Sequence, residues 1–562
     1  MRWRNVLCAG GLIVGVTAVV SPPAGATTST AGDATYVVLA TTPDSMGAAE
    51  QSVRAAGGVV VGRNNAVGML TVRAQGGGAF ADQIATSAAV SGVAENKAIG
   101  RSPKQLDVAD DATASSAVAD SSGDREAAKP AETYGDLQWD MKLIGATLDG
   151  SYREEKGNHG VTVGIIDSGV DGKHPDIAPN FSKKLSRNFV TDIPAIDGPC
   201  EVASCIDPVD QDDSGHGTHV AGIIGAALNG RGISGVAPKV TLVNIRAGQD
   251  SGFFFLDSTI NALTYAGDAG INVVNMSFFT DPWLFNCAAN PADSAAEQLE
   301  QRTIIEATQR ALEYAHRKGV VLVAALGNEG TDIGHPTIDT TSPDTDITGD
   351  VPSPRTRTVD NSCLIMPNEG VHVIGVSAIG PSTRLSFYSN YGIEQTEVSA
   401  PGGDSRDKGT GLANPANRVL STYSRAGAFD RGFIDAAGNP NATGRAKLEC
   451  KDGVCGYYAY EQGTSMASPH AAGVAALIVS KFGHEGRRDR VVMDPDAVQR
   501  ILFRTATKTP CPAVNPAVYP DTPAFTPFCE TAVDHNGFYG HGIVSAVNAV
   551  NDDHGDGDHG RD

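Results

Sequence analysis

Four short segments of the sequence present side chains that could do chemistry. Asp167 follows the apolar run VTVGII, and His216 stands between two glycines in GHGTH. Asn328 follows a strand-like run that ends in glycine, and Ser465 lies in GTSMASPH at the start of a run of small residues. A carboxylate at the C-terminal end of a buried strand lies where α/β sheets place their ligands and catalytic groups. We therefore interpret Asp167 as a functional residue, although an ordinary turn aspartate has the same local pattern.

Two of these segments could stabilise a negative charge. The amide side chain of Asn328 can donate a hydrogen bond to a developing oxyanion. Ser465 is predicted at the first turn of a helix, where free backbone N–H groups and the helix dipole favour an anion. The alternatives are a β-turn asparagine and a simple N-cap serine. Together the two segments indicate a site that binds an oxyanion.

The histidines near residue 216 allow two interpretations. His216 and His219 are one helical turn apart, a spacing at which two histidines could bind a metal ion. No acidic partner completes a zinc-protease pattern such as H-E-x-x-H. The glycines around His216 let backbone and substrate approach closely. We therefore predict that His216 is functional and that His219 and His470 are structural.

The elements that would position these residues alternate between strands and helices. This alternation predicts an α/β fold with a mostly parallel central sheet covered by helices on both faces. The expected strands are 161–166, 240–245, 273–277, 320–325 and 371–377, and the expected helices are 214–228, 256–269, 295–318, 464–482 and 495–505.

A smaller unit precedes this domain. Its patterns predict strands at 35–40, 58–62, 68–74 and 90–98 and helices at 44–56 and 80–87, an order of elements that is ferredoxin-like. We assign this unit to residues 27–101 and the larger domain to 134–550. Residues 102–133 are rich in Ala, Ser and Asp and poor in large apolar residues, which predicts an exposed linker open to proteolysis.

The two ends and the overall charge suggest an exported protein. Residues 1–26 combine a basic start, an apolar run and a small-residue A-G-A sequence, which is typical of a secretory signal peptide. No later segment has ~20 uninterrupted apolar residues, so no membrane anchor is expected. The formal charge of −22 argues against a nucleic-acid partner. The tail 551–562 is interpreted as a solvated acidic end, although its two histidines could bind a metal weakly.

The cysteines agree with export. Removing the signal would remove Cys8 and leave an even number of cysteines, which in an exported chain suggests disulfides. Closeness in sequence favours three pairs and leaves one more, with buried free thiols as the alternative. The expected pairs are Cys200–Cys205, Cys450–Cys455, Cys511–Cys529 and Cys287–Cys363.

Taken together, the four segments resemble the subtilisin-like serine protease family. The resemblance is carried by Asp167-Ser-Gly169, His216-Gly-Thr-His219 and Gly463-Thr-Ser-Met-Ala-Ser-Pro469, and it extends over roughly residues 137–550. It implies a secreted serine endopeptidase that needs no cofactor for its chemistry and acts on polypeptides. Ser465 would be the nucleophile, His216 the general base and acid, Asp167 the residue that orients His216, and Asn328 part of the oxyanion hole.

The resemblance also implies how the chain is activated. Residues 27–101 would be an inhibitory propeptide that covers the cleft in a zymogen and is then cut away. A monomer is expected. Both a broad secreted endopeptidase and a narrow processing protease for one partner protein remain open, as does a scaffold that has lost activity.

The same resemblance suggests substrate-binding and metal-binding positions. Two extended segments would pair with the substrate backbone, the first at Asp250-Ser-Gly-Phe253 and the second at Phe278-Phe279-Thr280 after Ser277. The bulky phenylalanines of the second suggest a restricted cleft. Calcium is common in the family, and Gln138 and Asp176 fall at positions that resemble a strong site, although the loop 228–235 is shortened. A structural calcium ion is left open. The substrate-binding candidates are Ser251, Gly252, Ser277, Phe278, Phe279, Ala325, Leu326 and Gly327.

Overall fold

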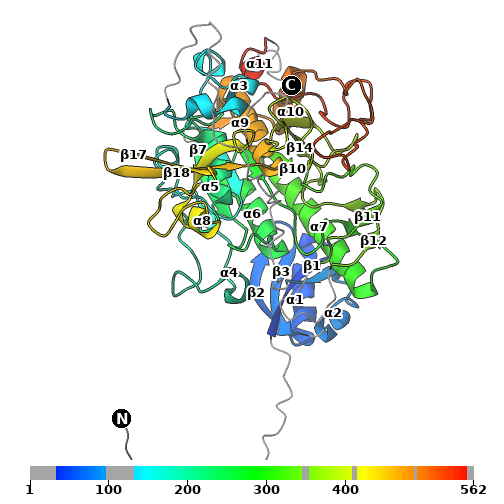
Figure 1. The fold of residues 1–562 in the computed structure, drawn as a ribbon. Coiled ribbons are helices and arrows are strands. Elements are labelled where there is room, and N and C mark those ends of the chain that lie inside the picture. Colours follow the sequence, from blue (N-terminus) through cyan, green and yellow to red (C-terminus); the bar gives the residue numbers. More distant parts are fainter. Residues whose placement is uncertain are drawn as a thin grey trace, which may run out of the picture.

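The structure is a computed structural model that describes residues 33–76, 78–96, 132–344, 354–407, 414–486 and 490–553. The predicted signal peptide, residues 102–131 of the linker and residues 554–562 of the acidic tail lie outside the described residues. Figure 1 shows a small N-terminal unit, coloured blue, packed against a larger domain. Among the described residues, no helix is both long and apolar enough to cross a membrane.

The N-terminal unit has the predicted ferredoxin-like arrangement. Its four-stranded sheet has the order β2-β3-β1-β4, and both β1–β3 and β1–β4 pair antiparallel. The apolar faces of β1 and β3 pack with the two helices in one buried cluster. The elements are β1 (Asp33–Ala40), α1 (Met46–Ala55), β2 (Val59–Asn64), β3 (Met69–Gln75), α2 (Ala79–Ile84) and β4 (Val90–Glu95).

The large domain is built on a seven-stranded sheet with the order β15-β14-β10-β8-β5-β7-β6. All of its strand pairs are parallel. The five predicted strands are confirmed with small shifts in their bounds. The strands are β5 (Thr162–Ile166), β6 (Arg187–Asn188), β7 (Thr241–Arg246), β8 (Val273–Met276), β10 (Val321–Ala325), β14 (Val373–Ile379) and β15 (Val398–Pro401).

Helices cover both faces of this sheet. Alternate residues of one strand point to opposite faces, so Val163 and Ile165 of β5 join one core whereas Ile166 joins the other. The first core contains α5 (His216–Gly225), α9 (Thr464–Phe482), α10 (Pro495–Thr505) and α11 (Ala546–Val550); the second contains α6 (Leu256–Ala269) and α7 (Ala295–Arg317). The predicted three-layer α/β domain is confirmed.

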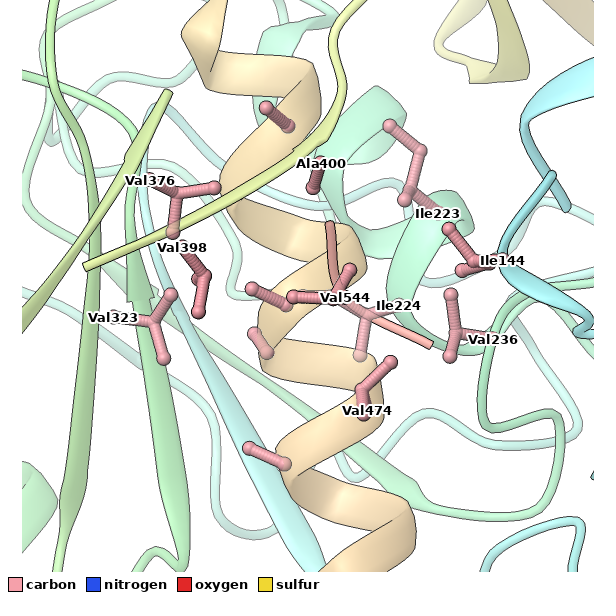
Figure 2. Close-up of a cluster of buried hydrophobic side chains, with 14 of the residues drawn as sticks. Ile144, Ile223, Ile224, Val236, Val323, Val376, Val398, Ala400, Val474 and Val544 are labelled. Atoms are coloured by element: carbon pink, nitrogen blue, oxygen red, sulfur yellow. The ribbon is translucent and has the colours of Figure 1, made fainter. Parts of the chain in front are cut away.

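Helix α9 runs through the centre of the first core. Small residues such as Ala471, Ala472 and Gly473 let it approach the sheet and α5 closely. A Cβ atom on Gly473 would lie 2.6 Å from the side chain of Val236. Figure 2 shows α9, in pale orange, between strand residues such as Val376 and Val398 and residues such as Ile224 of α5.

Further elements decorate this framework. A three-stranded antiparallel sheet, β16-β18-β17, lies beside α5, and its β17–β18 hairpin projects from the domain (Figure 1). The additional elements are α3 (Trp139–Ile144), α4 (Pro194–Asp197), β9 (Asn286–Cys287), β11 (Ile338–Asp339), β12 (Arg357–Thr358), β13 (Cys363–Leu364), β16 (Val419–Tyr423), α8 (Arg425–Asp430), β17 (Ala446–Lys451), β18 (Val454–Glu461), β19 (His484–Glu485) and β20 (Val491–Val492), with 3-10 turns at Pro43–Ser45, Gly135–Leu137 and Ser151–Arg153.

The four expected disulfides are present. Cys450–Cys455 closes the tip of the β17–β18 hairpin, and Cys287–Cys363 links β9 to β13. Cys200–Cys205 and Cys511–Cys529 close surface segments. All four pairs connect residues of the large domain.

The N-terminal unit rests on α6 and α7. Val37, Leu39 and Met69 belong to the same buried cluster as residues of these helices. The Thr71 hydroxyl donates to Asp257 at 2.5 Å, and Arg310 donates to the carbonyl of Ala40 at 2.8 Å. Buried apolar contacts and specific hydrogen bonds therefore join the two units.

Candidate active site

Asp167 and His216 form the first part of the site. Asp167 directly follows β5 and is fully buried, and its Oδ1 accepts a hydrogen bond from Nδ1 of His216 at 2.7 Å. The same oxygen accepts the backbone N–H of Ser168 at 2.8 Å. Because a carboxylate can only accept, Nδ1 of the neutral imidazole carries the proton and Nε2 carries the lone pair. This tautomer is the one that a general base acting through Nε2 requires.

The chain around His216 is shaped for this contact. A Cβ atom on Gly217 would lie 2.0 Å from the carbonyl oxygen of Gly169, so only glycine fits there. Gly215 has φ of +87°, and a Cβ atom there would lie 2.4 Å from the Tyr423 ring. Gly217 thus lets the start of α5 lie directly against the turn after β5, and Gly215 lets it lie against Tyr423 of β16.

The electrostatic surroundings favour the imidazolium form of His216. Burial by itself would lower the pKa of His216, but the negative charge of Asp167 and its hydrogen bond raise it, with smaller contributions from Asp212 and Glu461. The net pKa is above the ordinary value of 6.5. The imidazole is therefore a stronger base than a free histidine, while its side chain is still 15% exposed.

Ser465 is the second residue of α9 and is partly exposed. Its hydroxyl donates to the carbonyl of Ser277 at 3.2 Å, and its own carbonyl accepts from the Ser277 hydroxyl at 3.1 Å. The position in the first turn leaves its backbone N–H without an intrahelical partner. Both the hydroxyl and this N–H are thus at the helix start, where negative charge is favoured.

The backbone pairing of two strands brings these groups to one edge of the sheet. Ile166 of β5 pairs with Met276 of β8, so Asp167 and Ser277, the next residue on each strand, follow adjacent strand ends. His216 bonds to Asp167, and Ser465 bonds to Ser277. Helices α5 and α9, which carry the histidine and the serine, also pack against each other. Catalytic hydrogen bonds often tighten only once substrate is bound, so the Ser465–Ser277 bond is compatible with a later bond to His216.

Asn328 lies beside the start of α9. Its Oδ1 accepts the backbone N–H of Thr464 at 2.8 Å and the Thr464 hydroxyl at 3.0 Å. Since these donors fix the amide orientation, the Nδ2 group is the side that remains to donate. No described residue accepts a hydrogen bond from it. Asn328 is thus bonded to the residue that precedes Ser465 and has an unused amide donor, which is what an oxyanion hole needs.

Asn328→Ala is therefore expected to lower kcat on a peptide substrate by about 10²–10³-fold, with little change in KM. The amide would interact mainly with charge that develops in the transition state, so its loss affects the chemical step. Steady-state kinetics on a fluorogenic peptide would measure both constants. Asn439→Ala, on an exposed turn, is the matched control. An Asn328→Ala enzyme with normal kcat would exclude the oxyanion role.

The first candidate substrate segment folds back on itself. The Ser251 hydroxyl and backbone N–H both donate to Asp197, and the Gln249 N–H donates to the carbonyl of Phe253. Gly252 takes φ of +91° at this turn. The structure thus holds Ser251 and Gly252 in a tight loop in which several backbone groups are already used.

Aromatic packing holds the first residue of the second candidate segment, Phe278, in a buried position. The Phe278 side chain is 7% exposed, and its ring stacks on that of Phe254 with centroids 4.0 Å apart and an interplanar angle of 3°. This stack joins the two segments expected to border the substrate. Phe279 is partly buried against a separate apolar cluster. Ser277, which directly precedes this segment, exchanges two hydrogen bonds with Ser465.

The remaining candidates follow β10. Ala325 ends the strand, and Leu326 is fully buried in the same cluster as Phe285 and Ile365. The Leu326 side chain therefore packs into the domain instead of lining an open surface. Gly327 has φ of +107°, and its N–H donates to the Thr464 hydroxyl at 3.0 Å, which ties this turn to the start of α9.

Gln138 and Asp176, the candidates for calcium, lie close together but are already engaged. Gln138 both accepts from and donates to the backbone of Ser234. Asp176 accepts from the Ile233 N–H at 3.1 Å and from the Tyr458 hydroxyl at 2.9 Å, and burial raises its pKa to about 6. Carboxylates that bind calcium use these oxygens as ligands. In this structure these oxygens accept hydrogen bonds from the chain itself, and a calcium ion at these two residues stays a sequence-based expectation.

Tyr458→Phe is expected to lower the free energy of unfolding by about 1–3 kcal/mol, because it leaves the buried Asp176 carboxylate without its hydroxyl donor. Chemical denaturation at neutral pH would measure the loss. Tyr457→Phe, at the preceding residue of β18, removes a hydroxyl bonded to the carbonyl of Gly438; it is the control and should cost less. Equal losses in the two variants would contradict a special role for Tyr458.

His219 and His470, the two histidines predicted to be structural, are both buried. His219 is fully buried, its Nε2 lies 3.0 Å from the Ala459 carbonyl, and burial lowers its pKa to about 4. His470 is also fully buried and pairs with Asp140 of α3 at 3.1 Å. Neither ring can reach a substrate.

Sequence reasoning missed two acidic residues near His216. Asp212 accepts the N–H groups of Gly215 and Thr218 and so holds the start of α5. The usual N-cap pattern does not mark Asp212, because the N-cap residue of α5 is Gly215. Glu461, at the end of β18, raises the pKa of His216 and pairs with Arg445 at 3.1 Å. No local pattern marks Glu461, because it acts through the tertiary structure.

Known proteins resemble this chain in both sequence and structure. Subtilisin DY of Bacillus licheniformis is 28% identical over 57% of this chain and 77% of its own length. A thermophilic serine proteinase of Bacillus sp. (strain AK1) is 29% identical over 63% of this chain. The matched part covers 57% of the length of that relative. The crystal structure of the epidermin leader peptide processing serine protease from Staphylococcus aureus is 21% identical, has a TM-score of 0.61, and covers 93% of this chain and 98% of its own.

The model of one family covers the large domain. The family described as the subtilase family matches residues 158–524, which include all four candidate catalytic positions. This match spans more than half of the sequence, and the structural likeness shows the same fold. The chain therefore belongs to the subtilase family of serine peptidases.

Proposed function

We propose that this protein is a secreted serine endopeptidase that is made as a zymogen and cleaves peptide bonds through Asp167, His216 and Ser465. The observation that carries the proposal is the bond between Nδ1 of His216 and the buried Asp167 at 2.7 Å, at the sheet edge where Ser465 also lies. Four disulfides suit an oxidising compartment outside the cell.

Each residue has a defined part in the proposed reaction. The Ser465 Oγ attacks the scissile carbonyl while Nε2 of His216 takes its proton. The Asn328 amide and the Ser465 backbone N–H stabilise the oxyanion of the tetrahedral intermediate. Nε2 of His216 then gives its proton to the leaving amine, and water hydrolyses the acyl-enzyme by the same steps. Asp167 stabilises the imidazolium that exists between the two proton transfers.

The N-terminal unit is proposed to be the inhibitory propeptide. It packs on α6 and α7 through apolar contacts and the bonds made by Thr71 and Arg310. Its last strand, β4, lies against α7, and the Thr303 hydroxyl of α7 donates to the Val93 carbonyl at 3.3 Å. The chain that follows β4 includes the segment in which sequence analysis places the processing zone. Cutting there would separate the two units.

Wild-type protein is expected to release the N-terminal unit during refolding, whereas Ser465→Ala should keep it. Mass spectrometry and N-terminal sequencing would identify the cut. The full-length Ser465→Ala protein is the control for contaminating proteases. If this variant lost the unit in a purified refolding mixture, self-processing would be wrong, although the peptidase function itself would be tested separately by kinetics.

The stacked rings of Phe254 and Phe278 favour a restricted cleft over a broad one. Some relatives are named as processing enzymes, among them the nisin leader peptide-processing protease of Lactococcus lactis, 28% identical over 66% of this chain. We therefore propose cleavage at few sites in a peptide library. Phe278→Gly should widen the set of cleaved sequences. A wild-type enzyme that already cuts most peptides would favour the broad endopeptidase instead.

A further inference from the structure

A pair of histidines on the surface lies away from the candidate active site. His316 belongs to the last turn of α7, and His372 comes just before β14. Their rings stack with centroids 3.8 Å apart and an interplanar angle of 3°. Because the candidate catalytic residues follow the C-terminal ends of their strands, His372 lies at the opposite edge of the sheet.

Carboxylates fix the protonation of both rings. Nε2 of His372 bonds to Glu313 at 2.9 Å, and Nε2 of His316 bonds to Asp496 of α10 at 3.0 Å. Since a carboxylate accepts, each Nε2 is the donor in the neutral ring, and each Nδ1 carries a lone pair. No described residue donates a hydrogen bond to either Nδ1. A metal ion could therefore replace the Nε2 proton of His316 beside Asp496, with that proton released to solvent, and take the unused Nδ1 lone pair of His372.

We propose that His316, His372 and Asp496 form a surface site for a divalent transition-metal ion of the zinc type. One ligand atom from each residue lies within 4.8 Å of the others. Tetrahedral zinc at the usual bond lengths requires ligand nitrogens roughly 3.3 Å apart. The exposed fractions of the side chains, 14%, 36% and 54%, leave room for the rings to turn toward one ion and for water to complete its coordination.

The ligand types at this site favour one class of metal ion. Imidazole ligands suit zinc and its neighbours, whereas calcium and magnesium prefer oxygen ligands. Glu313 would hold Nε2 of His372 while Nδ1 binds the metal, an arrangement that strengthens histidine ligands. Glu313 also pairs with Arg317 at 2.9 Å, which keeps the carboxylate in place. The ion would link the end of α7, the start of β14 and the start of α10.

Isothermal titration of the whole protein with ZnCl₂ tests the site, with CaCl₂ as the comparison ion. Titration of the wild type with zinc should give a binding heat that titration with calcium does not give. His372→Ala should bind one zinc ion fewer per protein molecule. Glu313→Gln should weaken this binding about 10–100-fold. Because these residues are remote from Ser465, peptide hydrolysis should be unchanged in the variants, so the result is independent of the proposed function.

Two controls separate this site from others. His335→Ala alters an exposed histidine that has carboxylate neighbours but stacks on no ring among the described residues, and it should keep the full stoichiometry. His554→Ala combined with His559→Ala removes the tail histidines and should also keep the site. Four-coordinate Co²⁺ bound to wild type would give a visible absorption that His372→Ala lacks. Unchanged zinc binding in His372→Ala, or no zinc binding by wild type, would overturn the proposal.

Discussion

Ser465→Ala is expected to lower kcat on a peptide substrate by about 10⁶-fold, the size of effect that the corresponding change has in subtilisin. The alanine removes the only atom that can form the acyl-enzyme, while the helix start and the Asn328 amide remain. Residual hydrolysis should therefore still exceed the uncatalysed rate, because oxyanion stabilisation does not depend on the hydroxyl. Single-turnover kinetics with an activated ester and a peptide would measure the loss.

The activity of Ser465→Ala must be compared with that of wild type when both proteins are fully folded. The Ser465 hydroxyl makes one bond, to the Ser277 carbonyl, so its removal should cost little stability. Ser362→Ala, an exposed serine bonded to Asp360, is the control and should keep normal activity. Retention of more than a few per cent of the wild-type rate by Ser465→Ala would mean that another residue is the nucleophile.

Asp167→Asn is expected to lower kcat/KM by about 10⁴-fold at neutral pH. An amide at this place can donate to Nδ1 of His216, and that would move the ring proton to Nε2. The histidine would then have no lone pair facing the serine. The buried carboxylate also stabilises the imidazolium, so the variant would lose charge stabilisation in the transition state as well.

The pH profile separates these effects from a folding defect. In wild type the pKa of His216 is raised above 6.5, so activity should fall as pH drops below that raised value and the imidazole becomes protonated. Without the Asp167 charge the pKa should fall, and the acidic limb of the profile should move to lower pH. Asp435→Asn, an exposed aspartate, should leave the profile unchanged. An unshifted limb in Asp167→Asn would contradict the assignment of Asp167.

Raised basicity also affects stability. Because the folded pKa of His216 is above its ordinary value, protonation of His216 favours the folded state. This contribution is fully present below the ordinary pKa and is lost as pH rises through the folded pKa. The working, neutral form of the base is thus the form that Asp167 stabilises less.

Sequence alone predicted the elements whose patterns are strong and local. Helices α6, α9 and α10 begin and end at the predicted residues, because apolar periodicity and end signals such as Pro495 agree there. Three of the disulfide pairs followed from closeness along the chain, and Cys287–Cys363 was the pair that remained. The candidate catalytic segments stood out in the sequence because each combines a polar side chain with nearby glycines.

Other features depend on contacts between distant segments. The strands of the β17–β18 hairpin lack a clear alternation, and their order comes from pairing with β16 and from Tyr458 reaching Asp176. The pairing of His470 with Asp140 joins residues that have no sequence relation. The Phe278 side chain was expected to crowd the cleft, but its stacking partner, Phe254, could not be predicted from the sequence. Long-range packing of this kind has no local signal.

The most direct test of the account is covalent labelling by a fluorophosphonate, which reacts with a serine only where a base and an oxyanion hole activate it. Matured wild type should be labelled at Ser465, as located by mass spectrometry of the digested protein. His216→Ala should lose the label although its serine is intact. Labelling at a different serine, or full labelling of Ser465 in His216→Ala, would contradict the proposal that these two residues act as one catalytic unit.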